Sequence, residues 1–133
     1  MKLELKEEQG YRYVEQGTGP TLLLLHGLFG AMSNFSGVFD AFSDKYRVII
    51  PIIPIYDKSE AEASVDGLTE FVEGFVAFKG LKDLTLMGNS LGGHIALVFS
   101  LRNPDLVRAM ILTGSSGLFE SGMGSGFPKR GSY

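Results

Sequence analysis

A serine flanked by glycines is the residue of this sequence best suited to chemistry. Residues 88–92 read Gly-Asn-Ser-Leu-Gly and lie between an apolar, strand-like run and a helix-like stretch. A strand that turns directly into a helix strains the backbone of the connecting serine, and only glycines at Gly88 and Gly92 leave room for the close packing. The hydroxyl of Ser90 would then stand on a sharp turn, where a nucleophile for acyl transfer is placed. A lone Gly-x-Ser-x-Gly is a weak pattern, but this strand and helix context makes it a strong one.

A second glycine-containing segment could stabilise the charge that such a reaction develops. Attack on a carbonyl places negative charge on the substrate oxygen, which backbone N–H groups held in advance can stabilise. Residues 26–30 read His-Gly-Leu-Phe-Gly and follow the apolar run 21–25. Ligands of open parallel sheets bind at the carboxyl ends of the strands, where both segments would lie. The N–H groups of Leu28 and Leu91 could therefore converge beside Ser90.

Strands are needed to hold these two segments, and the sequence predicts six of them. Residues 3–6 and 11–15 alternate apolar and polar side chains on either side of a polar turn at residues 7–10, which predicts a β-hairpin. Continuous apolar runs without a solvent face then predict strands covered on both sides in a parallel sheet. These runs are residues 21–25, 48–50, 84–87 and 109–112.

Three segments with helical spacing of apolar residues connect the predicted strands. They are residues 35–42, 65–76 and 93–102. Ser33 and Ser64 are the candidate N-caps of the first two, and Gly80 is a candidate stop for the second. We therefore predict an α/β fold with a mostly parallel sheet, an N-terminal β-hairpin and helices on both faces. Residues 1–113 would form the sheet and helices of a single partial domain, and the Gly- and Ser-rich residues 114–133 a loop or tail.

Composition excludes several classes of function. The chain has 133 residues, a formal net charge of −3 and no basic cluster beyond Lys129-Arg130, which argues against a nucleic-acid or anionic-membrane partner. The absence of cysteine removes disulfides, thiolate catalysis and cysteine-based metal sites, and is compatible with the cytoplasm. Residues 1–6 do not read as a signal peptide, and no apolar run approaches the ~20 residues that span a bilayer. We expect a cytoplasmic protein with a small-molecule substrate and no cofactor or metal.

The two motifs, in this order, resemble those of the α/β-hydrolase fold family. His-Gly-Leu-Phe-Gly at residues 26–30 follows the third predicted strand, and Gly-Asn-Ser-Leu-Gly-Gly at residues 88–93 follows the fifth. The resemblance covers residues 3–128 and extends to the subgroup that contains carbon–carbon bond hydrolases and small-ester hydrolases. It implies roles for seven residues: Ser90 as nucleophile, Leu28 and Leu91 as backbone oxyanion donors, and His26, Gly27, Gly88 and Gly92 as structural support.

The acid and base that such a serine requires are missing from the expected positions. In this family the nucleophile precedes an acid and then a histidine. After Ser90 the only carboxylates are Asp105 and Glu120, and the only histidine is His94. We expect His94, in the first turn of its helix, to pack beneath the sheet while the nucleophile projects into the cleft. The chain is therefore interpreted as the N-terminal part of a serine hydrolase, ending after the sixth strand and inactive alone.

Two alternatives to an enzyme fragment follow from the same absence. The chain could be a non-catalytic, hydrolase-like protein that binds a small molecule or a partner. Alternatively, two copies could pair to complete one site, since an apolar sixth strand at residues 109–112 leaves an edge that favours self-association. A natural reading frame that continues with an aspartate and a histidine would favour the enzyme, and one that ends near residue 133 would favour the binding protein.

Overall fold

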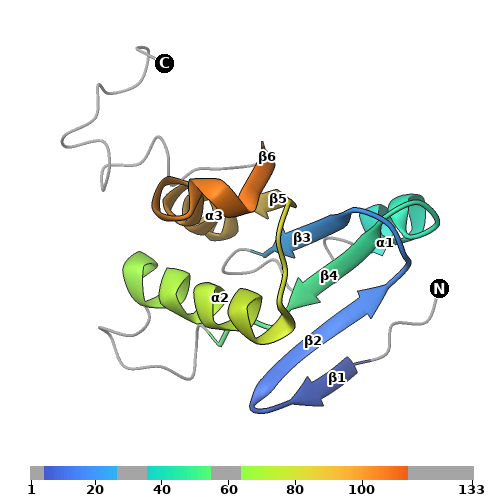
Figure 1. Ribbon diagram of the computed structural model, residues 1–133, viewed down its shortest axis with the longest axis horizontal. Helices are drawn as coiled ribbons and strands as arrows, with labels where there is room; N and C mark the ends of the chain where they lie inside the picture. The colour runs from blue at the N-terminus through green and yellow to red at the C-terminus, as the bar shows by residue number, and fades with distance from the viewer. Residues whose placement is uncertain (1–4, 27–35, 55–63, 114–133) are drawn as a thin grey trace.

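The structure is a computed structural model that describes residues 5–26, 36–54 and 64–113. Its six strands form one sheet in the order β1-β2-β4-β3-β5-β6, with three α-helices packed around it (Figure 1). The elements are β1 (Leu5–Glu8), β2 (Tyr11–Gln16), β3 (Thr21–Leu25), α1 (Ser36–Phe42), β4 (Arg47–Pro51), α2 (Val65–Lys79), β5 (Leu84–Asn89), α3 (Leu91–Arg102) and β6 (Val107–Thr113). Strands β4, β3, β5 and β6 are parallel, and β2 joins β4 antiparallel. The predicted fold class is confirmed.

The N-terminal hairpin has a shorter turn than its sequence predicts. Only Gln9 and Gly10 lie between β1 and β2, with φ of 50° and 85°. Two successive positive φ values characterise the two-residue turn whose twist matches that of the flanking strands. The expected turn over residues 7–10 was wrong, because Glu7 still lies opposite Arg12 in the antiparallel register.

Helix α2 begins and ends at the predicted residues. The Ser64 hydroxyl accepts a hydrogen bond from the N–H of Gly67 at 3.0 Å, which satisfies one of the unpaired donors of the first turn. At the other end Gly80 has a φ of 66°, a left-handed conformation that suits glycine and closes the helix. The first predicted helix begins at Ser36, and its candidate cap Ser33 lies outside the described residues.

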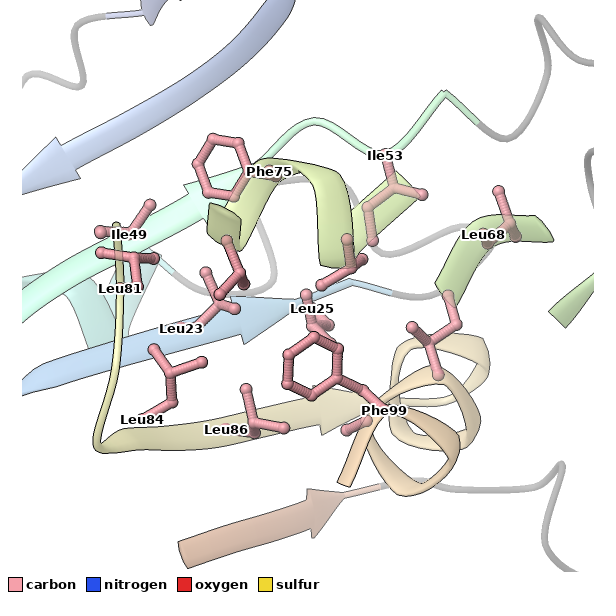
Figure 2. Packing of buried hydrophobic residues seen from close by; sticks show 14 of the residues in the cluster. Leu23, Leu25, Ile49, Ile53, Leu68, Phe75, Leu81, Leu84, Leu86 and Phe99 are labelled. Carbon is pink, nitrogen blue, oxygen red and sulfur yellow. The ribbon is translucent and has the colours of Figure 1, made fainter. Parts of the chain in front are cut away.

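Alternate side chains of the central strands enter two apolar layers. One lies between the sheet and helices α2 and α3, and Figure 2 shows its packing. The other lies on the opposite face, where Phe42 of α1 lines a small pocket with Leu22 and Met87. Helices therefore cover both faces of the sheet. The fully buried members of the first layer include Leu23, Leu25, Ile49, Phe75, Leu86 and Phe99.

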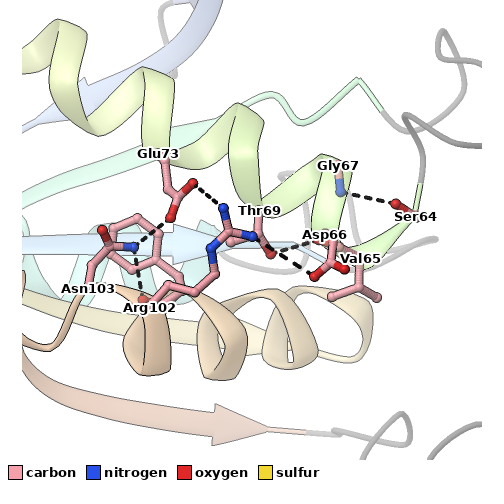
Figure 3. Close-up of polar contacts among 9 residues, drawn as sticks. Ser64, Val65, Asp66, Gly67, Thr69, Glu73, Arg102 and Asn103 are labelled. Atoms are coloured by element: carbon pink, nitrogen blue, oxygen red, sulfur yellow. Dashed lines mark hydrogen bonds and ion pairs between the residues drawn. The ribbon is translucent and has the colours of Figure 1, made fainter.

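Polar contacts join α2 to the end of α3 (Figure 3). Glu73 accepts hydrogen bonds from Nη2 of Arg102 at 2.9 Å and from Nδ2 of Asn103 at 2.8 Å. The Asn103 amide also donates to the carbonyl of Phe99 at 3.1 Å, at the last turn of α3. Because the Arg102–Glu73 ion pair is partly exposed, we expect it to contribute little to the free energy of folding.

Strand β6 is less buried than predicted. Met110 and Leu112 pack against the core beside α3, whereas Ala109 is exposed and Ile111 is 43% exposed. The expectation of a strand covered on both sides was wrong for this strand, because β6 is the outer strand of the sheet in the part of the chain that the structure describes. Association of two copies through this edge stays a prediction.

Three charged side chains connect β2, β4 and α2. The carboxylate of Glu15 accepts hydrogen bonds from Nζ of Lys79 at 2.8 Å and from Nε of Arg47 at 2.6 Å. Burial by itself raises the pKa of Glu15, but the hydrogen bonds from Lys79 and Arg47 outweigh it and hold that pKa below its ordinary value. The ionised carboxylate therefore stabilises the folded state.

We expect Glu15→Gln to lower the free energy of unfolding by about 1–3 kcal/mol at neutral pH, because two partly buried cations lose their charged acceptor. A carboxyl with a lowered folded-state pKa stabilises fully above its unfolded-state pKa and loses that effect as the pH falls through the folded-state value. The difference from the parent should therefore shrink below pH 4.5, the ordinary pKa of glutamate. Urea unfolding across this pH range measures it.

The control is Glu70→Gln, which removes the same charge from an exposed position of α2. It should change the free energy of unfolding by less than about 0.5 kcal/mol at any pH in the series. A deficit of Glu15→Gln that stays constant on acidification would show that its cause is packing and not charge.

Candidate active site

Ser90 lies at the corner between β5 and α3. Its φ of 59° and ψ of −122° place it outside the helix, in a conformation that is strained for a residue with a side chain. Its N–H donates to the carbonyl of Thr113 at 3.1 Å, and its own carbonyl accepts from the N–H of Gly93 at 2.9 Å. These hydrogen bonds on both sides hold the serine on a strand-to-helix turn, as a nucleophile elbow requires.

The glycines on either side of Ser90 allow a very close approach of backbone segments. A Cβ on Gly92 would lie 2.1 Å from the carbonyl oxygen of Leu25 and 2.7 Å from that of His26, at the end of β3. A Cβ on Gly88 would lie 2.4 Å from the carbonyl oxygen of Gly92. Since every one of these neighbours is backbone, a side chain at either position would force the elements apart. Gly92 therefore lies directly against the end of β3, at Leu25 and His26.

His26 connects the end of β3 to the segment that follows β4. The side chain is buried, and its Nε2 accepts a hydrogen bond from the N–H of Ile53 at 3.1 Å. A ring nitrogen that accepts a hydrogen bond carries no proton. The imidazole thus holds two strand ends together. Gly27 and Leu28, which follow it, lie outside the described residues, so the roles predicted for them stay predictions.

Leu91 and His94 belong to the first turn of α3. The N–H groups of a first helical turn have no acceptor within the helix, so the Leu91 N–H is suited to the predicted role of oxyanion donor. The backbone N–H of His94 donates to the carbonyl of Ser90 at 3.3 Å. Both Ser90 and His94 are described in the structure, and no hydrogen bond joins the imidazole of His94 to the hydroxyl of Ser90. His94 is therefore not placed as the base of Ser90.

In the described part of the chain after β5, the only side-chain carboxylate is that of Asp105, and it lies far from Ser90. Asp105 is exposed in the 3₁₀ turn Pro104–Leu106, beyond the far end of α3. A helix of 12 residues is about 18 Å long, which separates Asp105 from the serine. Glu120 lies outside the described residues. Among all the residues that the structure describes, no group of three side chains could hold a metal ion, and no helix is long and apolar enough to cross a membrane.

Thr113 and Asn89, to which the sequence analysis assigned no role, support the turn at Ser90. Besides accepting from Ser90, Thr113 places its hydroxyl 3.2 Å from the side-chain oxygen of Asn89 and 3.5 Å from the carbonyl of Gly88. These contacts tie the ends of β5 and β6 together beside the serine. They depend on β6 lying next to β5, so no local pattern in the sequence could have indicated them.

A strained serine at a strand-to-helix corner, with Gly92 of that helix lying against the end of a neighbouring parallel strand, characterises the site of this α/β protein. Comparison with known families agrees with this class. A family model described as the alpha/beta hydrolase fold matches residues 20–131, and the chain belongs to that family.

Solved structures and curated relatives extend the likeness. An α/β hydrolase enzyme from the metagenome of sediments of the lagoon of Mar Chica, Morocco, is 46% identical with a TM-score of 0.82, over 88% of this chain and 54% of that one. A putative lipase from Acinetobacter baumannii is 34% identical with a TM-score of 0.75, over 84% of this chain and 42% of that one. The 2-hydroxy-6-oxo-6-phenylhexa-2,4-dienoate hydrolase of Comamonas testosteroni is 35% identical over 80% of this chain and 40% of its own length. The chain thus spans about half or less of each of these relatives.

Proposed function

We propose that this chain is the nucleophile-bearing part of a serine-dependent α/β hydrolase that acts on an ester or a related carbonyl substrate. The observation that carries the proposal is the strained backbone of Ser90, with a φ of 59°, at the corner between β5 and α3. Such a conformation costs of order 1–3 kcal/mol and persists where the surrounding structure enforces it, often at functional sites. Gly88 and Gly92 are the neighbours that make this corner possible.

The proposed reaction is acyl transfer to water in two steps. The Ser90 hydroxyl oxygen attacks the substrate carbonyl, and the oxyanion accepts hydrogen bonds from the N–H groups of Leu28 and Leu91. A histidine outside this chain takes the serine proton and passes it to the leaving group. Water then attacks the acyl-serine with the same histidine as base, which releases the acid and restores the hydroxyl.

The chain alone is proposed to have little or no turnover. A serine hydroxyl is a weak nucleophile without an adjacent base. Among the described residues, His26 is engaged with the N–H of Ile53, and His94 makes no side-chain hydrogen bond to Ser90. The base and its acid partner would therefore come from further polypeptide, which agrees with relatives of which the match to this chain covers only 54% and 40%.

Cleavage of a carbon–carbon bond next to a carbonyl is a second candidate reaction for the same serine. It is supported by the similarity to the Comamonas testosteroni hydrolase, at 35% identity, whose name describes a substrate with an oxo group. The roles proposed for Ser90, Leu28 and Leu91 are the same in both reactions, because each begins at a carbonyl carbon.

Two other proposals compete with an enzyme fragment. In one, the chain is a non-catalytic, hydrolase-like binding protein. In the other, a second copy completes the site, which is favoured by the outer edge of β6 with its exposed Ile111. These proposals differ in whether Ser90 ever becomes reactive and whether its reactivity depends on protein concentration.

Labelling with a fluorophosphonate probe tests these proposals together. The arms are the 133-residue chain, its complete natural reading frame, and both with Ser90→Ala or with the control Ser100→Ala in α3. We expect labelling of the complete frame, a loss of at least about a thousandfold on Ser90→Ala and no loss on Ser100→Ala. The chain alone should label little at any concentration.

Each alternative has its own outcome. Equal labelling of the chain and the complete frame would refute the missing base, and labelling that survives Ser90→Ala would refute the nucleophile. Labelling of the chain alone that increases with its concentration would support a site completed by a second copy. A complete reading frame that ends near residue 133 and does not label would support the binding protein.

A further inference from the structure

The beginnings of the parallel strands, at the opposite end of the sheet from Ser90, surround a polar cavity of about 380 Å³. Its lining comes from the beginnings of β3, β4 and β6 and from the connection between α2 and β5. Ser90 follows the other end of β5, a strand of six residues that is about 20 Å long. The cavity is therefore separate from the candidate active site, and a ligand bound in it would not depend on the proposed hydrolase function.

Cations dominate the lining of this cavity. Arg47, Lys82 and Arg108 contribute three positive charges against one negative charge from Asp83, although the whole chain has a net charge of −3. None of the ion pairs formed among the described residues involves Lys82 or Arg108. The contact of Arg47 with Glu15 uses Nε and leaves the two terminal nitrogens outside that pair. The cavity thus holds unneutralised positive charge.

A local irregularity of the sheet places one of these cations. Leu84 pairs with Val107 and Thr85 pairs with Ala109, so Arg108 is an extra residue at the beginning of β6. Such a bulge changes the direction of the side chain at that position relative to regular pairing. Arg108 therefore lines the cavity, while the residues on either side of it in β6 are paired with residues of β5.

The backbone around the other two cations is held by hydrogen bonds. The N–H of Arg47 donates to the carbonyl of Pro20 at 2.9 Å, and its Nε is fixed on Glu15. Next to Lys82, the N–H of Leu81 donates to the carbonyl of Val76 at 3.0 Å, just past the end of α2. Cations presented from restrained backbone lose less conformational freedom when they bind a ligand.

We propose that this cavity binds a small phosphate-bearing anion. A phosphate carries close to two negative charges near neutral pH, and Lys82 and Arg108, which form no ion pair among the described residues, each supply a positive charge to meet it. Arginine side chains contact phosphate through two parallel N–H donors, and lysine adds a compact positive charge. The volume accepts a phosphate group together with a small attached organic group.

Titration of the 133-residue chain with inorganic phosphate, followed by the amide resonances in ¹H–¹⁵N spectra at constant ionic strength, tests the proposal. We expect shifts confined to the connection between α2 and β5 and to the beginnings of β3, β4 and β6. The double variant Lys82→Gln/Arg108→Gln should weaken binding by about tenfold or more, because it removes two charge-assisted contacts. Ser90→Ala should bind phosphate as the parent does.

The control Lys6→Gln/Arg12→Gln removes the same charge from exposed positions of the N-terminal hairpin, outside the cavity lining. It should change the affinity by less than about twofold. Equal weakening by both double variants, shifts spread over the whole surface, or no shifts at about 10 mM phosphate would overturn the proposal. A parallel titration with methyl phosphate separates the sources: tighter binding than inorganic phosphate indicates a phosphomonoester, and equal binding indicates the free ion.

Discussion

Gly92→Ala is expected to lower the free energy of unfolding by about 3 kcal/mol or more, enough to unfold much of the population of a marginally stable domain. The added Cβ would lie 2.1 Å from the carbonyl oxygen of Leu25, so α3 and β3 would have to move apart. The carbonyl belongs to a central strand with parallel neighbours on both sides and cannot rotate away. Urea unfolding followed by circular dichroism measures the change.

Gly37→Ala is the matched control for this substitution. Gly37 is also helical, in α1, but a Cβ there would meet nothing within 4 Å. Because alanine has the higher helix propensity, this variant should gain up to about 1 kcal/mol or stay unchanged. If both alanines had the same effect, the close approach of Gly92 to β3 would not be the reason for glycine at that position.

Phe75→Ala is expected to lower the free energy of unfolding by about 3–5 kcal/mol, because it removes a large buried side chain and leaves a cavity. Phe75 is fully buried on the inner face of α2, between that helix and the sheet (Figure 2). Its ring centroid lies 5.6 Å from that of Tyr11 and 5.4 Å from that of Tyr13, so the variant also loses two aromatic contacts. Thermal and urea unfolding measure the loss.

Phe42→Ala provides a comparison with the same chemical change at a partly exposed site. Phe42 is 39% exposed at the end of α1, with its ring 5.8 Å from that of Tyr46. Its removal should cost about 1–2 kcal/mol, since less apolar surface returns to water and solvent fills the space. A loss equal to that of Phe75→Ala would show that the layer beneath α2 is not the main core of the chain.

The sequence by itself determined the elements whose chemistry is local. The cap at Ser64 and the stop at Gly80 depend only on which residues can satisfy or reverse a helix end, and both are where the sequence predicted them. Continuous apolar runs specified the central strands β3, β4 and β5, because a strand buried on both faces needs no polar side. The spacing of Gly88 and Gly92 around Ser90 predicted a tight corner for the same reason: close backbone approach requires glycine wherever it occurs.

Only the tertiary structure decided which of these elements lie side by side. Three features join segments that lie far apart in the chain. They are the ion pair of Glu15 with Lys79, the bulge at Arg108 in the pairing of β5 with β6, and the hydrogen bond from the Ser90 N–H to Thr113. The exposure of Ile111 likewise depends on β6 lying at the edge of the sheet. Local patterns specify what a segment can become, but distant contacts depend on the order of strands in the sheet, which the hydrogen bonds and packing of the whole domain select together.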